Sequence, residues 1–121
     1  MRRAAATEPR RSAPQLVRIA AEETFAGDLD GHGTVTFLQV LAADGSASFV
    51  GVERFVGSLD GRAGSFVLAD RGTQSSDGRV SGEWRVVPGS GTEGLLGLSG
   101  EGGFNASLGE KASVYLDYRL D

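Results

Sequence analysis

Glu53 and Gln39 are the polar residues whose positions best suit chemistry inside a pocket. Glu53 shares one face of a predicted strand with Phe49 and Phe55, and Gln39 follows Phe37 on the same face of another. A polar group on an apolar face costs free energy unless it is hydrogen-bonded. If these faces line the interior of a barrel, burial raises the pKa of the Glu53 carboxyl and suits it to acid–base chemistry.

A surface position for Glu53 is the alternative. The carboxylate would then pair with an arginine at the surface or at the end of the barrel, and the candidates are Arg54, Arg62 and Arg85. Both faces of the strand that carries Glu53 are rich in apolar residues. The sequence therefore leaves both positions open.

Residues 89–94 spell G-x-G-x-x-G, the fingerprint of dinucleotide-binding sites. The fingerprint works only where a full helix begins and points its N-terminus at a pyrophosphate. Residues 95–100 are too rich in glycine to form that helix, and no βαβ unit surrounds them. We interpret the motif as a structural turn and predict no cofactor.

His32 is the only histidine, and it lies between two glycines in a turn predicted at residues 30–33. We expect its side chain to be exposed. One histidine cannot build a multi-histidine metal site, and the chain has no cysteine for a thiolate site. We predict no metal site.

The elements that position these residues are predicted to be antiparallel strands. Residues 46–68 form the clearest hairpin, because Asp60-Gly61 suits a tight primed turn between two apolar runs. Thr92 is predicted to cap a short helical turn over residues 92–98. Further strands are predicted at residues 15–29, 34–43, 79–87, 100–108 and 112–120, with turns at 44–45 and 76–78.

Composition sets limits on the class of protein. A chain of 121 residues predicts one domain, which we place at residues 15–121, after a disordered basic arm at residues 1–14. The net charge of −4 argues against nucleic-acid binding, and no apolar run is long enough to span a membrane. The absence of cysteine fits a cytoplasmic location.

Four runs of the sequence resemble a bacterial family of unknown function. They are residues 24–31, 47–54, 59–68 and 82–92. The resemblance covers about residues 15–121 and implies a closed, eight-stranded meander barrel similar to that of allene oxide cyclase. It implies no activity, because fold alone does not carry function.

The N-terminus departs from that family. Its members usually begin with an additional strand before the equivalent of Gln15, and residues 1–14 do not supply one. The sequence therefore predicts an all-β antiparallel meander barrel of seven to eight strands, either open or completed by a partner chain. An open edge favours association, so we expect a homo-oligomer.

The leading functional hypothesis is a binding module whose barrel holds a small lipophilic molecule. One alternative is a cofactor-free isomerase or cyclase that uses the Glu53 carboxyl, and another is a structural or stress-related protein with a filled core. The sequence does not decide whether the protein is an enzyme.

Trp84 and Tyr118 are expected in the core or the cavity wall. The candidate ligand-binding residues are Phe37, Gln39, Glu53, Phe66, Trp84, Phe104 and Tyr118.

Overall fold

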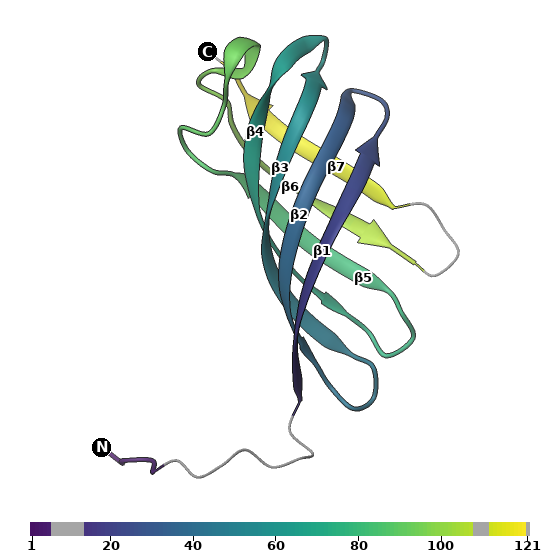
Figure 1. The fold of residues 1–121 in the computed structure, drawn as a ribbon, viewed down its shortest axis with the longest axis vertical. Coiled ribbons are helices and arrows are strands. Elements are labelled where there is room, and N and C mark those ends of the chain that lie inside the picture. Colours follow the sequence, from purple (N-terminus) through teal and green to yellow (C-terminus); the bar gives the residue numbers. More distant parts are fainter. Residues whose placement is uncertain (6–13, 108–111, 121) are drawn as a thin grey trace.

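The computed structural model of the chain describes residues 1–5, 14–107 and 112–120. They form one antiparallel sheet in which seven strands follow one another in chain order (Figure 1). The all-β class predicted from the sequence is confirmed. The elements are β1 Gln15–Phe25, β2 Leu29–Leu41, β3 Ala47–Leu59, β4 Arg62–Gln74, β5 Val80–Val86, the 3₁₀ turn η1 Glu93–Leu95, β6 Ser99–Ala106 and β7 Ser113–Arg119.

The predicted hairpin is the central pair of the sheet. β3 and β4 are in register up to Leu59 and Arg62, with Asp60 and Gly61 between them. Both turn residues have positive φ, 48° and 83°, as a primed two-residue turn requires. Glycine adopts this conformation without a steric penalty, so the Asp-Gly pair fixes the register of both long strands.

The turn predicted at residues 30–33 is wrong. These residues belong to β2, where His32 pairs with Val56, and the chain reverses earlier, between Phe25 and Leu29. Gly31 is needed for a close approach of strands, because a Cβ atom there would lie 2.3 Å from the carbonyl oxygen of Val56. His32 is exposed, as predicted.

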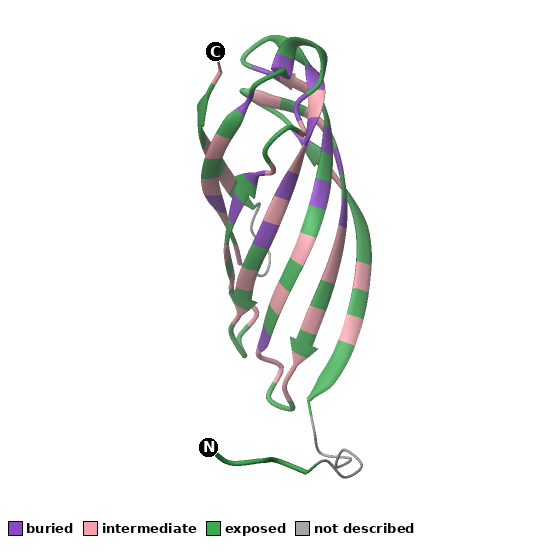
Figure 2. Ribbon diagram, turned by 90° about the vertical axis from the view of Figure 1, so that its left-hand side faces the viewer, coloured by how far each residue is buried: buried purple, intermediate pink, exposed green. Residues whose placement is uncertain are grey.

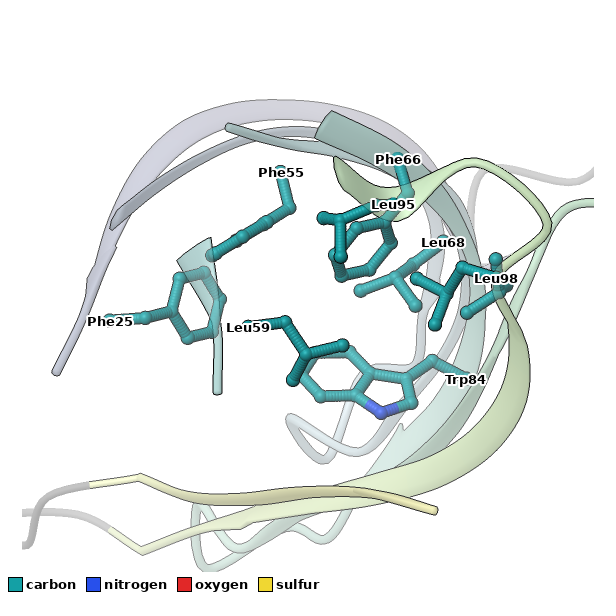
Figure 3. Close-up of a cluster of buried hydrophobic side chains, with 9 residues drawn as sticks. Phe25, Phe55, Leu59, Phe66, Leu68, Trp84, Leu95 and Leu98 are labelled. Carbon is teal, nitrogen blue, oxygen red and sulfur yellow. The ribbon is translucent and has the colours of Figure 1, made fainter. Parts of the chain in front are cut away.

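Alternation along the strands gives the sheet an inner and an outer face (Figure 2). The inner face carries the odd-numbered residues of β1, β2 and β3 and the even-numbered residues of β4 to β7. The sheet curves around this face and encloses the core (Figure 3). The buried core cluster is Phe25, Phe55, Leu59, Phe66, Leu68, Trp84, Val86, Leu95 and Leu98.

The loop after β5 closes one end of the core. Thr92 donates its backbone N–H to the carbonyl of Ser65 at 2.9 Å, so the loop continues along the edge of β4. Thr92 precedes η1 as predicted, but its side chain makes no capping bond. Its hydroxyl accepts the backbone N–H of Ser65 at 3.0 Å instead. This attachment places Leu95 and Leu98 among the buried side chains.

The sheet does not close into a barrel. Among the described residues β1 pairs only with β2, and β7 pairs only with β6. The seven-stranded open form is therefore the one observed, and the closed eight-stranded barrel that the resemblance implies is not. Within the described part of the chain, no helix is long and apolar enough to cross a membrane. Residues 6–13 of the predicted arm lie outside the described residues.

Candidate functional site

The aromatic side chains of the inner face form one continuous chain of ring contacts. It includes all six phenylalanines and the single tryptophan. We call it the aromatic chain. In order of contact, with distances between ring centroids, it runs Phe37–Phe49 (5.1 Å), Phe49–Phe104 (6.1 Å), Phe104–Trp84 (5.4 Å), Trp84–Phe25 (6.4 Å), Phe25–Phe55 (5.7 Å) and Phe55–Phe66 (5.0 Å).

Glycines opposite the rings make this arrangement possible. Gly82 pairs with Phe104, and a Cβ atom at Gly82 would lie 2.3 Å from the Phe104 ring. Gly51 pairs with Phe37, and a Cβ atom there would lie 2.5 Å from the Phe37 ring. Each ring therefore lies across the neighbouring strand in space that any other residue would fill. The glycine-rich sequence of the strands is thus a packing requirement of the interior.

Three carboxyl groups lie on the same inner face, on β1, β3 and β4. Glu53 is 1% exposed and Asp70 is 5% exposed, whereas Glu23 is only partly buried. Glu53 Oε2 and Asp70 Oδ1 are buried and have no hydrogen-bond partner among the described residues. We call Glu23, Glu53 and Asp70 the acidic cluster. Buried polar atoms without partners are rare in folded proteins and mark places where function is to be sought.

The Glu53 carboxyl lies over Gly33, at the edge of the aromatic chain. A Cβ atom at Gly33 would lie 2.1 Å from Glu53 Oε2 and 3.0 Å from the Phe25 ring. Gly33 pairs with Glu23 on β1, so the Glu53 carboxyl points along the sheet toward that strand. The arrangement contradicts a surface position in which Glu53 pairs with an arginine.

Burial controls the ionisation of the acidic cluster. Loss of hydration, the largest cause, and the charges of Glu23 and Asp70 together raise the pKa of Glu53 to about 8. Loss of hydration and the charge of Glu23 raise the pKa of Asp70 to about 7. Burial also raises the pKa of Glu23. Around neutral pH, the two deep carboxyls therefore hold protons that exposed carboxyls would have lost.

Positive charge is scarce beside the acidic cluster. Of the arginines on the described strands, only Arg62 falls on the inner face, and it is exposed at the β3–β4 turn. Arg54, Arg71 and Arg85 alternate to the outer face. The fold thus places three acids together, and the residues that the structure describes supply no buried cation to neutralise them.

The residues predicted to bind a ligand divide into two groups. Glu53, Phe66, Trp84, Phe104 and Phe37 are brought together by the aromatic chain and the acidic cluster. The other two, Gln39 and Tyr118, belong to neither the aromatic chain nor the acidic cluster.

Gln39 is partly exposed on the inner face, paired with Phe49. Tyr118, expected in the core or the cavity wall, is 38% exposed and therefore not in the core, and it donates its hydroxyl to Asp60. Trp84 is buried as expected, and its indole N–H donates to the backbone carbonyl of Tyr115 at 2.9 Å.

Sequence reasoning missed two members of the acidic cluster. Asp70 follows Phe66 and Leu68 at the two-residue spacing that places it on their face. Glu23 stands in the same relation to Phe25. The two-residue alternation therefore already placed both acids on the inner face, and applying it to polar as well as apolar residues would have found them.

The G-x-G-x-x-G run does not open a long helix. Residues 89–94 lead into η1, which spans only Glu93–Leu95 and offers no helix for a dinucleotide. Among the described residues no group of three or more His, Cys, Asp or Glu side chains is arranged to hold a metal ion.

A hollow of about 670 Å³ lies against the outer face, across β3 to β7. Apart from the buried Asp70, its charged side chains are exposed, and two of them, Arg71 and Glu83, pair at 2.5 Å. Of the residues predicted to bind a ligand, it includes only Trp84. Its lining is Val50, Ala69, Asp70, Arg71, Glu83, Trp84, Arg85, Glu101, Gly102, Tyr115 and Asp117. The unpartnered groups of the inner face make that face the stronger candidate.

Comparisons with known proteins agree with the fold. A crystal structure of a protein of unknown function from the DUF3224 family of Shewanella oneidensis MR-1 is similar, with a TM-score of 0.79 and 31% sequence identity. The match covers 98% of this chain and 87% of that chain. The search of curated proteins found no match. The model of the family described as protein of unknown function (DUF3224) matches residues 1–118, and the chain therefore belongs to this family.

Proposed function

We propose that the protein binds a small, mainly apolar molecule against the inner face of its sheet. The observation that carries this proposal is the continuous aromatic chain with two buried, unpartnered carboxyl groups beside it. Ligand sites are mostly apolar, with a few polar groups that fix orientation. Aromatic rings supply the area for burial, and the acidic cluster supplies the orientation.

The ligand would bind toward the end of the inner face that the loop does not fill. At the opposite end, Leu95 and Leu98 pack into the core. Away from them many inner-face side chains are only partly buried, and most of these are apolar. They include Val17, Ile19, Phe37, Phe49, Phe104, Val114 and Leu116. A partly exposed apolar surface continuous with the core gives a small molecule a place to bind.

Native mass spectrometry of the full chain purified from its own host tests the proposal. A stoichiometric small-molecule adduct that is lost on denaturation supports binding, and solvent extraction would identify its chemistry. Trp84, the only tryptophan, gives a second readout because its ring belongs to the aromatic chain. If apolar probes leave its fluorescence unchanged and the purified protein has its bare mass, the proposal fails.

A second candidate function is a cofactor-free isomerase or cyclase that uses the Glu53 carboxyl. The observation that favours it is the raised pKa of Glu53, about 8, and of Asp70, about 7. General acids and bases work best when their pKa lies near the working pH. The Glu53→Gln variant separates the two functions, since an enzyme loses turnover although an apolar probe still binds, whereas a binding module has no turnover to lose.

A further inference from the structure

We infer that the ligand is an organic cation, an amphipathic amine whose ammonium group binds at the acidic cluster and whose apolar body lies on the aromatic chain. The inference rests on the proposed function and specifies the chemical class of the ligand. Its basis is the charge, burial and geometry of three carboxyls and the rings around them.

The first argument is the missing counter-charge. Glu53 Oε2 and Asp70 Oδ1 are buried, accept no hydrogen bond and face no buried cation among the described residues. Buried charges in proteins are normally paired or hydrogen-bonded. A ligand that brings a positive charge and N–H donors would supply both missing interactions.

The second argument is the aromatic surroundings. The Phe25 ring approaches the same point above Gly33 as Glu53 Oε2. Trp84 lies next in the aromatic chain, with its ring centroid 6.4 Å from that of Phe25. Ring faces attract ammonium groups, and tryptophan does so most strongly. Carboxylates and rings together favour an organic cation over a neutral lipid or an anion.

The third argument concerns a metal ion as the rival cation. No group of three His, Cys, Asp or Glu side chains in the described residues is arranged to hold one. Hard cations require several oxygens at short, defined distances. An organic ammonium makes weaker geometric demands and can be stabilised by a spread-out cluster.

Glu23 is the member of the acidic cluster that a ligand meets first. It lies on the edge strand β1 and is only partly buried, whereas Glu53 and Asp70 are almost fully covered. The charge of Glu23 acts on both deeper carboxyls. An ammonium group beside Glu23 would therefore lower the pKa of all three, and binding would release protons from the deep pair.

Three probes of nearly equal shape test the inference: 1-naphthylmethylamine, 1-naphthylmethanol and 1-naphthoate. Their affinities for the full chain are measured at pH 7 by Trp84 fluorescence and by titration calorimetry in two buffers of different ionisation enthalpy. We expect the amine to bind about tenfold more tightly than the alcohol. The naphthoate should bind weakest, and only the amine should release protons.

The outcomes distinguish this inference from the proposed function. If the alcohol binds as tightly as the amine, the inner face is a binding site but the inference is wrong. If none of the three probes binds, the proposed function fails as well for ligands of this size.

Variants locate the cation. Glu23→Gln and Asp70→Asn should each reduce the preference for the amine over the alcohol while alcohol binding persists, which also shows that the variants are folded. The matched control is Glu83→Gln, since Glu83 is an exposed outer-face glutamate paired with Arg71. The inference is overturned if the control weakens amine binding as much as the inner-face variants do.

Discussion

Asp70 and Arg71 are neighbours in the chain, yet their side chains leave β4 on opposite faces and meet opposite conditions. Asp70 is 5% exposed and has an unpartnered oxygen, and its pKa is raised to about 7. The Arg71 side chain is 73% exposed and pairs with Glu83. The outer face satisfies its charges with each other and with water. The inner face holds buried acids without hydrogen-bond partners among the described residues, and the proposed binding site rests on that difference.

A second aspartate shows that the residue type does not decide the chemistry. Asp77 lies in the β4–β5 turn, where it accepts hydrogen bonds from the Ser75 hydroxyl and the Arg79 guanidinium. These bonds, the Ser75 one foremost, lower its pKa to about 2. Asp70 is buried without such donors, and its pKa is raised instead. An exposed turn stabilises the carboxylate, and the inner face stabilises the protonated acid.

Truncating a side chain on each face gives the largest expected contrast in stability. Phe55 is 1% exposed and its neighbour Val56 is 54% exposed. Phe55→Ala should cost about 3–5 kcal/mol, because it removes buried area and leaves a cavity within the aromatic chain. Val56→Ala should change the free energy of unfolding by about 0.5 kcal/mol or less. Urea unfolding of both variants checks this, and equal losses would contradict the assignment of faces.

The pH dependence of stability tests the acidic cluster. The pKa of Glu53 rises from 4.5 to about 8, so the folded state keeps a proton that the unfolded state loses. The free energy of unfolding should therefore fall as pH rises from about 4.5 to about 8, by up to about 1.4 kcal/mol per pH unit for this group. Asp70 adds to the slope between 3.8 and about 7.

Glu53→Gln should flatten that slope and make the protein more stable than the wild type at pH 8. Glu83→Gln, on the outer face, should retain the wild-type slope. Thermal or urea unfolding from pH 4 to pH 9 measures both variants. An unchanged slope in Glu53→Gln would mean that its carboxyl ionises normally in the folded protein, and the contrast between the faces would be lost.

Amide substitutions at Asp70 and Asp77 should change the free energy of unfolding in opposite directions. At pH 8, above the raised pKa of Asp70, Asp70→Asn removes a buried charge and should stabilise the protein by about 1 kcal/mol. Asp77→Asn weakens the bonds to Ser75 and Arg79 and should destabilise it slightly.

The pH dependence of the two variants should differ as well. Because the pKa of Asp77 is lowered from 3.8 to about 2, its contribution to stability is present above pH 3.8 and is lost as pH falls toward 2. Melting temperatures at pH 3 and pH 8 measure both effects. Two shifts of the same sign at pH 8 would show that burial does not separate the two carboxyls.

Local patterns in the sequence predict the sheet well and its closure poorly. Two-residue alternation and Asp-Gly turns are sufficient to predict the β3–β4 hairpin and to offer an inward position for Glu53. The prediction of a turn at residues 30–33 was wrong because glycine occurs both in turns and at places where two strands approach closely. At Gly31 it permits a close approach of strands, which depends on Val56 of the neighbouring strand. No pattern within one strand distinguishes that use from a turn.

The parts of the site that the sequence does not reveal depend on long-range contacts. Trp84 is held by the backbone carbonyl of Tyr115, two strands away, and the loop after β5 is held by Ser65. The acidic cluster joins residues of β1, β3 and β4, and it depends on the register in which β3 pairs with β4 and β2 pairs with both β1 and β3. Alternation assigns each residue to a face, and the fold alone decides which residues of that face meet.

The smallest expected effect is the coupling of Arg71 with Glu83 on the outer face. Their atoms approach to 2.5 Å, but the side chains are 73% and 62% exposed, so water and salt screen the pair. A double-mutant cycle with Arg71→Ala and Glu83→Ala should give a coupling of about 1 kcal/mol or less, and less still at high salt. A markedly larger coupling, unaffected by salt, would mean that the outer face also excludes water. The distinction between unsatisfied inner acids and solvated outer charges would then no longer support the proposed site.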